Sequence, residues 1–241
     1  MPGRSLTRSM ALPAAAIALP AAAVADALVR LGLPVRLGPP AVRRAFPGAP
    51  IAGPAVPCQH FGSVDVFLEA YEAAPAGGVL VIDNEGRTDE ACIGDLTVAE
   101  AKIAGLVGVV LWGLHRDSAA LRGIGLPVWS LGTLPAGPRG ARTRDADPLA
   151  TARLGDVVVT RDDVVSADDD GVVVVEAASW AEVAAVASQI VADESRQAGR
   201  IAAGTSLRRQ LGFADYLARR AVDPEYTLRR HLLERGGAIE T

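Results

Sequence analysis

Three short apolar segments constrain the fold of this sequence more than any other feature. They cover residues 78–83, 107–112 and 127–131, and each is an almost continuous apolar run. Short runs of this kind are typical of strands buried on both faces of a sheet. Between the first two, Asp95 is followed by strong helix formers, which predicts a helix with Asp95 as its N-cap. Strand, helix and strand form a unit whose strands are parallel, so the sequence predicts an α/β fold.

Other segments predict the elements around this unit. The expected elements are a β-like segment at 51–56, a helix at about 63–74, strands at 156–160 and 171–175 around a turn signature at 166–171, a long helix from the capping box of Ser179 and Glu182 to about Ala203, and two short helices broken at Asp223-Pro224. Residues 135–148 are rich in Gly, Pro, Arg and Asp, which predicts an exposed loop. We expect one α/β domain over residues 1–203 and a helical extension over residues 204–241.

The first 25 residues resemble a secretory signal peptide, with two arginines before an apolar stretch and Ala-Val-Ala at 23–25. Two prolines interrupt that stretch, however, and apolar residues recur at helical spacing from Val24 to Leu31, just before Gly32. The apparent cleavage site therefore lies inside an amphipathic helix that ends at a C-cap glycine. No segment is long and apolar enough to span a bilayer, so we expect a cytoplasmic protein.

Composition excludes several classes of function. Cys58 and Cys92 are the only cysteines, so neither a disulfide framework nor a four-cysteine zinc site is available. A net charge of −4 gives no broad basic surface for nucleic acid. Lys102 is the only lysine, and it lies about 10 Å along its helix from Asp95, which is a poor position for a Schiff base there. No phosphate loop, dinucleotide fingerprint or serine-hydrolase elbow is present.

The spacing between Asp95 and the pair Arg116-Asp117 predicts that they meet. A helix of about 11 residues leads roughly 16 Å away from the strand ends, and a strand of five or six residues leads roughly 17 to 20 Å back. The two paths nearly cancel. Asp95 at the helix start and Arg116-Asp117 after the next strand should therefore share the carboxyl edge of the sheet, where α/β proteins commonly bind ligands.

This edge offers groups that suit an anion held together with a hard cation. The backbone N–H groups of Leu96 and Thr97 at the helix N-terminus favour a carboxylate or phosphate, Arg116 can grip a carboxylate through two hydrogen bonds, and the two aspartates suit Mg²⁺ or Mn²⁺. On spacing alone a structural interpretation stays open, in which Asp95 only caps the helix and Arg116-Asp117 is a surface ion pair.

The segment from Gly94-Asp95 to Arg116-Asp117, with twenty residues between the two aspartate-containing pairs, resembles the Asp-x20-Arg-Asp motif of 4-hydroxy-4-methyl-2-oxoglutarate aldolases. These aldolases belong to the RraA-like family, together with the regulator of ribonuclease activity A. Similar segments recur in order at 24–28, 53–55, 78–83, 104–110, 125–128, 155–159 and 167–173. The resemblance covers most of residues 20–195 and implies a three-layer β/β/α fold of the swivelling-domain type, assembled as homotrimers or hexamers.

The resemblance also implies a site that uses Mg²⁺ or Mn²⁺ to bind a pyruvate-like oxo-acid. Asp117 matches the metal ligand, and Arg116 matches the group that binds the oxo-acid carboxylate. Gly94, Leu96 and Thr97 match the substrate-binding loop with its backbone donors. Asp95 matches the carboxylate near a metal-bound water, and the regulator branch usually lacks this acidic residue, so its presence favours the aldolase branch.

Other candidate residues have simpler interpretations. His115, which precedes Arg116 where the aldolases more often have a small or apolar residue, is either a proton donor or a structural hydrogen-bonding group. His60 lacks the further ligands that a zinc site needs, and residues 168–170 lack the ligand spacing of a calcium loop and are expected to form a turn. The arginine pairs at 208–209, 219–220 and 229–230 are expected on exposed or subunit-contacting helix faces rather than on RNA.

The sequence is thus interpreted as a metal-dependent lyase that cleaves a 4-hydroxy-2-oxo-acid, with oxaloacetate decarboxylation as a related activity. Both reactions leave a pyruvate enolate, whose charge a Lewis-acidic metal stabilises. The alternative is a non-enzymatic regulator that binds a ribonuclease or helicase. A menaquinone methyltransferase label, often attached to this family, has no support, because no glycine-rich adenosylmethionine loop is visible.

Overall fold

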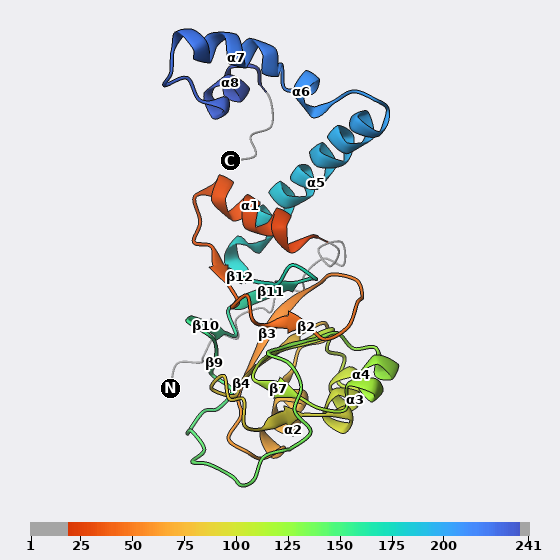
Figure 1. The fold of residues 1–241 in the computed structure, drawn as a ribbon. Coiled ribbons are helices and arrows are strands. Elements are labelled where there is room, and N and C mark those ends of the chain that lie inside the picture. Colours follow the sequence, from red (N-terminus) through yellow and green to blue (C-terminus); the bar gives the residue numbers. More distant parts are fainter. Residues whose placement is uncertain (1–18, 237–241) are drawn as a thin grey trace, which may run out of the picture. The chain divides into compact units, whose positions relative to one another are not determined.

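The computed structural model describes residues 19–236, and their contacts divide the chain into two compact units (Figure 1). The first unit ends at Ala184 and the second begins at Ala185, within helix α5 (Trp180–Ala202). Each unit is described by itself, and the domain boundary expected after residue 203 stays a prediction. Among residues 19–236, no helix combines the length and the apolar character needed to cross a membrane.

An eight-stranded mixed sheet forms the centre of the first unit. In spatial order its strands are β1 (Arg36–Leu37), β12 (Val172–Glu176), β11 (Asp163–Ala167), β3 (Ile51–Gln59), β4 (Val79–Asp83), β6 (Gly108–Trp112), β8 (Val128–Ser130) and β2 (Arg43–Arg44). The four strands β3, β4, β6 and β8 are parallel, as the strand–helix–strand pattern predicts, whereas β1, β12, β11 and β2 pair antiparallel with their neighbours. The predicted α/β class is confirmed.

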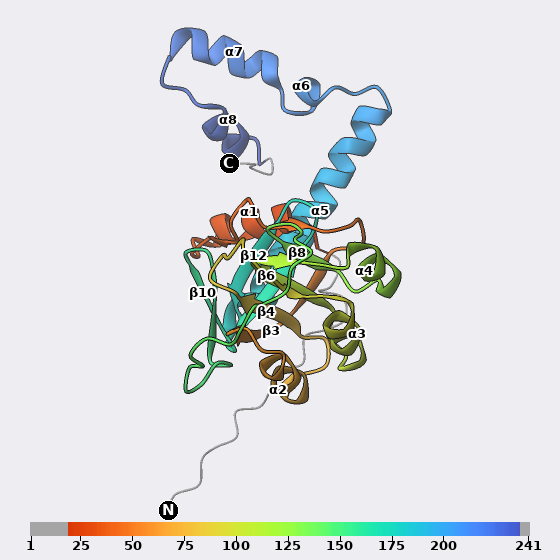
Figure 2. The same ribbon diagram turned by 60° about the horizontal axis from the view of Figure 1, so that its bottom comes forward.

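The sheet is the middle layer of three (Figure 2). Helices α2 (Asp65–Ala73), α3 (Asp95–Ile103) and α4 (Ser118–Ile124) cover one face, and the hairpin of β9 (Thr151–Leu154) and β10 (Val157–Thr160) packs on the other. Within β4, Leu80 and Ile82 join the cluster on the helix side, while Val79 and Val81 join the cluster on the hairpin side. This alternation explains why the strand is apolar throughout, since successive side chains point to opposite faces.

Two local predictions were wrong in detail. Helix α3 begins at Asp95 itself, and Gly94 is its N-cap. The strand at residues 157–160 does not pair across the turn with the strand at 172–176: it pairs with β9, and Asp163–Ala167 forms the hairpin partner of β12. The acidic stretch at 168–171 is the turn of that hairpin, as expected, because the Asp168 N–H donates to the Gly171 carbonyl over 3.0 Å.

The start of the described chain is anchored in the first unit. Helix α1 (Ala21–Leu31) ends at Gly32, whose φ of 67° is left-handed, as a C-cap glycine requires. Its first N–H, at Ala21, donates to the Asp168 carboxylate over 2.8 Å. Residues 23–25 lie inside this helix, whereas the apolar stretch before residue 19 lies outside the described residues.

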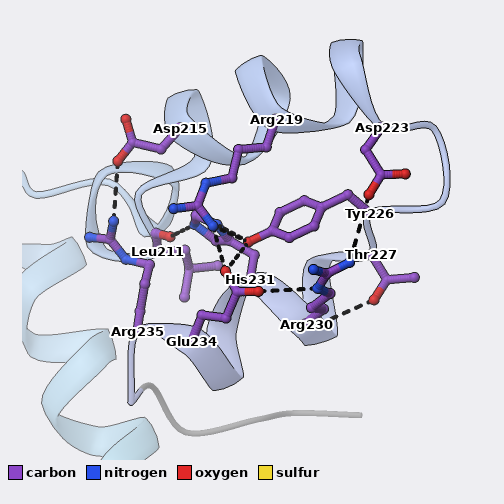
Figure 3. A network of polar contacts seen from close by, with 10 residues as sticks. All are labelled: Leu211, Asp215, Arg219, Asp223, Tyr226, Thr227, Arg230, His231, Glu234 and Arg235. Atoms are coloured by element: carbon purple, nitrogen blue, oxygen red, sulfur yellow. Dashed lines mark hydrogen bonds and ion pairs between the residues drawn. The ribbon is translucent and has the colours of Figure 1, made fainter.

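The second unit contains the remainder of α5 and the short helices α6 (Leu207–Gln210), α7 (Phe213–Val222) and α8 (Leu228–Glu234). Helix α7 ends at Asp223, and Pro224 follows, as predicted. Around the buried Tyr226, a polar network ties α7 to α8 (Figure 3): its hydroxyl donates to Glu234 over 2.8 Å and accepts from Arg219 over 2.9 Å, while Arg230 bonds Glu234 over 3.1 Å. The ring of His231 packs edge-on against the ring of Tyr226, and its Nε2 lies 3.1 Å from the Leu211 carbonyl oxygen.

Candidate functional site

The candidate site forms where two short parallel strands end. Strand β5 (Ala91–Ile93) comes after β4 in the sequence, and β7 (Leu114–His115) comes after β6. Strands β5 and β7 pair with each other in parallel. Just past this pair, the Arg116 N–H donates to the Ile93 carbonyl over 3.0 Å. This bond holds the residue before Gly94 next to the start of Arg116-Asp117, so the geometry expected from the path lengths is what the structure shows.

Asp117 lies between the other two charged residues of the site. Its Oδ2 accepts from the backbone N–H of Asp95 over 3.3 Å and lies 3.4 Å from Arg116 Nε. Asp117 adopts a left-handed backbone with φ of 60°, a region that Asp and Asn tolerate better than most residues. The side chains of Arg116 and Asp117 are 48% and 38% exposed, so the site is open to solvent in the single chain.

There is no space for a side chain at Gly94, which lies next to Asp117 and Arg116. A Cβ at this position would lie 2.3 Å from Asp117 Oδ2, closer than real contacts allow, and 3.1 Å from Arg116 Nε, which is a tight contact. The hydroxyl of Thr97 holds the backbone of Gly94 in place. It accepts a hydrogen bond from the Gly94 N–H over 3.1 Å and donates one to the Gly94 carbonyl over 2.9 Å. Thr97 therefore positions the glycine through its side chain.

The helix N-terminus differs from the sequence-based expectation at Leu96. Its N–H was expected to be a free donor, but it donates to Asp95 Oδ1 over 2.7 Å. The cause is local: a carboxylate in the first turn lies within reach of the next N–H and is favoured by the helix dipole. An anion could therefore bind the Leu96 N–H only if the Asp95 carboxylate moved away.

The donor set fits a hydrated divalent cation rather than a closed metal cage. Within residues 19–236, no group of three or more His, Cys, Asp or Glu side chains could hold a metal ion. Two carboxylates are nevertheless present, and Asp117 Oδ1 has no protein partner among the described residues. Mg²⁺ commonly binds through one or two carboxylates and takes its other ligands from water and substrate, so Asp117 fits that kind of binding, with Asp95 next to it.

His115 is buried and hydrogen-bonded through both ring nitrogens, which favours its interpretation as a structural group. Its Nδ1 is 2.7 Å from the Ser130 hydroxyl and its Nε2 is 3.1 Å from the Ser118 hydroxyl. With both ring nitrogens engaged and the ring 2% exposed, His115 supports β7 and the start of α4 beneath the site. Lys102 donates to the Ile124 carbonyl over 2.5 Å. Ile124 is the last residue of α4, whereas Asp117 precedes its first residue, so the amino group of Lys102 lies at the opposite end of this helix from Asp117.

Burial of two histidines predicts a pH-dependent stability. Burial lowers the pKa of His60 and of His115 from the ordinary value of 6.5, and the positive charge of Arg122 lowers that of His115 further. Below about pH 6.5 the two histidines therefore bind more protons in the unfolded chain than in the folded one. Their contribution to the free energy of unfolding is complete above about pH 6.5 and is lost as the pH falls toward their lowered pKa values in the folded protein. Urea unfolding between pH 7.5 and 5 should show the loss. The double variant His60→Gln, His115→Gln should lose less over that range, and an equal loss in both proteins would contradict the assignment.

One neighbour of the site was not predicted from sequence. A Cβ on Gly137 would lie 2.9 Å from Arg116 Nη1, so the loop after β8 passes directly beside the guanidinium. Adjacent residues pin that loop, since the Ala91 N–H donates to the Ala136 carbonyl over 2.8 Å. The only sequence signal was a glycine in a polar loop. A polar cavity of about 300 Å³ near His60, Asp83 and Arg142 contains none of the predicted site residues.

Comparison with known proteins identifies the family. A family model described as RraA-like, Aldolase/RraA, matches residues 21–174, well over half of the sequence. The chain belongs to the RraA-like family. The match includes the segment from Gly94 to Asp117, so the resemblance to the RraA-like family is confirmed.

Solved structures with the RraA-like fold agree with this membership. An uncharacterized protein from Pseudomonas syringae pv. tomato is 25% identical with a TM-score of 0.66, covering 79% of this chain and 92% of that chain. Streptomyces coelicolor RraAS2, described as an unusual member of the RNase ES inhibitor RraA protein family, is 28% identical with a TM-score of 0.61, covering 75% and 91%. A Geobacillus kaustophilus protein named as a 2-dimethylmenaquinone methyltransferase is 29% identical with a TM-score of 0.55, covering 63% and 93%.

Proposed function

We propose that the chain is a lyase that uses Mg²⁺ or Mn²⁺ to cleave a 4-hydroxy-2-oxo-acid to pyruvate, with oxaloacetate decarboxylation as a related activity. The observation that carries the proposal is the position of Asp117, which lies between the Asp95 N–H and the Arg116 guanidinium. Family membership supports it, because the RraA-like model includes aldolases. The same resemblance supports a cytoplasmic homotrimer or hexamer, and the 81% exposure of Leu96 at the site is compatible with a neighbouring subunit there.

Each residue of the site has a distinct role in this proposal. Arg116 directs Nε toward Asp117, so its terminal nitrogens remain to grip the substrate carboxylate in a fixed orientation. Asp117 contributes a carboxylate oxygen to the cation, and Asp95 holds a proton-carrying water near the reacting carbon. When bound, the metal would supply Lewis-acid stabilisation of the negative charge that develops on the 2-oxo group.

The alternative is a regulator without catalytic activity that binds a ribonuclease or helicase. The description of RraAS2, as a member of an RNase ES inhibitor family, makes this a real competitor. The two differ in one respect that can be measured directly: only the lyase releases pyruvate from an oxo-acid. The aspartate at position 95 favours the lyase, because the regulator branch, by the resemblance described above, usually lacks an acidic residue at this position.

Chelation is the first test of the proposed chemistry. With oxaloacetate and a panel of 4-hydroxy-2-oxo-acids, pyruvate release should stop in EDTA and return with Mg²⁺ or Mn²⁺. Lys102→Arg should keep the activity, since Lys102 binds the end of α4 and a long cation still fits there. Borohydride added with substrate should leave the protein mass unchanged. A covalent adduct on Lys102, or turnover without metal, would refute the metal mechanism in favour of a Schiff base.

Arg116→Lys tests the substrate grip. An ammonium group cannot reproduce the planar two-point contact of a guanidinium with a carboxylate, so we expect kcat/KM to fall by about 100-fold, with a higher KM. Arg122→Lys in α4 is the matched control, because Arg122 is a nearby exposed arginine outside the group around Asp117. Equal kinetics for Arg116→Lys and the wild type would place Arg116 outside the site.

A further inference from the structure

A second cavity, separate from the Asp117 site, lies at the edge of β3. It has a volume of about 230 Å³ and is bounded by residues 54–57 of β3, by Ala70 and Ala73 of α2, and by Leu149 and Arg161. Strand β3 and helix α2 lie next to each other at this point (Figure 2). None of the residues assigned to the proposed lyase site takes part.

The cavity exists because the partner of β3 changes halfway along the strand. Ile51 to Pro54 pair with β11, and Ala55 to Gln59 pair with β4 on the opposite side. Beyond Pro54, β11 no longer follows β3. Four consecutive residues line the cavity, and successive side chains of a strand point to opposite faces. The cavity therefore opens onto the edge of β3 that β11 has left.

An added peptide strand is a poor occupant for this edge. Strand addition needs a row of backbone donors and acceptors along the receiving edge. Pro54 and Pro57 have no N–H group, and proline is a common means of preventing edge-to-edge pairing. The backbone here thus favours a small molecule over an extended peptide.

The residues that line the cavity are apolar except for one arginine at the rim. Val56 and Ala70, on the helix side of the sheet, are buried and apolar and form the floor. Arg161 is the only charged side chain of the lining, and its Nε donates to the Leu149 carbonyl over 3.0 Å. That bond holds the guanidinium at the rim, while its terminal nitrogens have no partner within residues 19–236. An apolar floor below one fixed, unpaired cation complements a molecule with an aliphatic tail and a single negative end.

We propose that this cavity binds a short aliphatic monocarboxylate. The tail lies over Val56 and Ala70, and the carboxylate accepts hydrogen bonds from Arg161. The volume of about 230 Å³ is smaller than that of pockets for drug-sized molecules, so a short chain such as hexanoate is the suitable size of ligand. The proposal is independent of the lyase activity, since it uses a different part of the sheet.

Titration calorimetry of the full chain with hexanoate tests the proposal. Saturable binding with a Kd of about 1 mM is expected for a ligand of this size. Hexanamide, which keeps the tail but lacks the charge, should bind at least about tenfold more weakly. Acetate, which lacks the tail, should not saturate over the same range. Equal binding of hexanoate and hexanamide, or no saturable binding of hexanoate, would overturn the proposal.

Two variants locate the site. Arg161→Gln should weaken hexanoate binding by about tenfold or more, and Ala73→Leu, at an exposed position on the rim, should fill the cavity and abolish binding. Arg208→Gln in α6 is the control for an exposed arginine outside the cavity and should bind normally. Wild-type affinity in Arg161→Gln would overturn the assignment even if Ala73→Leu failed to fold. A change of sedimentation in either variant, with no hexanoate binding to the wild type, would instead indicate that a second copy covers this edge.

Discussion

Asp117→Asn should remove metal-dependent pyruvate release while leaving the fold intact. Asparagine has the same shape and also tolerates the left-handed backbone found here, with φ of 60°, but it lacks the charge that a divalent cation needs. We expect kcat/KM to fall by at least about 100-fold, equivalent to about 2.7 kcal/mol of transition-state stabilisation. Steady-state kinetics over a range of Mg²⁺ and Mn²⁺ concentrations will measure the loss.

Asparagine is a better test here than alanine, because alanine in a left-handed conformation costs about 1–2 kcal/mol in its own right. Asp117→Ala should lose the same activity and should also melt earlier, and the difference between the two variants separates chemistry from backbone strain. Asp89→Asn, at a 68% exposed carboxylate in the loop before β5, is the matched control and should keep full activity. Normal turnover by a folded Asp117→Asn protein would remove Asp117 from the metal site.

The strands of the sheet and the edge of the site could be predicted because they depend on simple periodic features. The run at 78–83 is apolar on both faces since β4 is covered by helices on one side and by a hairpin on the other. The approach of Asp117 to Asp95 followed from helix and strand rise alone, and the structure places the Asp95 N–H 3.3 Å from the Asp117 carboxylate. Neither inference required knowledge of a long-range contact.

Features that depend on a particular long-range pairing could not be predicted. Strands β5 and β7 are only three and two residues long, too short to produce a pattern, yet they align Gly94 with Arg116. The valines of residues 157–159 and 172–175 have the same strand preference, and only the choice of partner distinguishes them. The contact between Gly137 and Arg116 joins a loop to a strand end, and no local rule anticipates it.

The N–H of Leu96 is an example of a motif residue whose hydrogen-bond donor is already used within the chain. A helix N-terminus was expected to offer free donors, but an acidic residue in its first turn accepts one of them. The same carboxylate thus satisfies the donor in the single chain and is assigned to a proton-carrying water in the proposed reaction. In the proposed reaction, the Leu96 N–H becomes available to a substrate only if the Asp95 carboxylate releases it.

Gly94→Ala should reduce activity by about 100-fold, because a displacement of about 1 Å at a reacting group can cost that much. The added Cβ would lie 2.3 Å from Asp117 Oδ2, so the carboxylate and the Arg116 guanidinium must both shift. The backbone should accept alanine, since Gly94 has an extended φ of −149° and the atoms it meets belong to exposed side chains. Stability should therefore change little, while kcat/KM falls. Gly123→Ala in α4, where no atom lies within 4 Å of the new Cβ, is the control and should keep its activity. Full activity of Gly94→Ala would mean that Asp117 and Arg116 need not occupy the positions seen here, and the proposed geometry of the site would then be wrong.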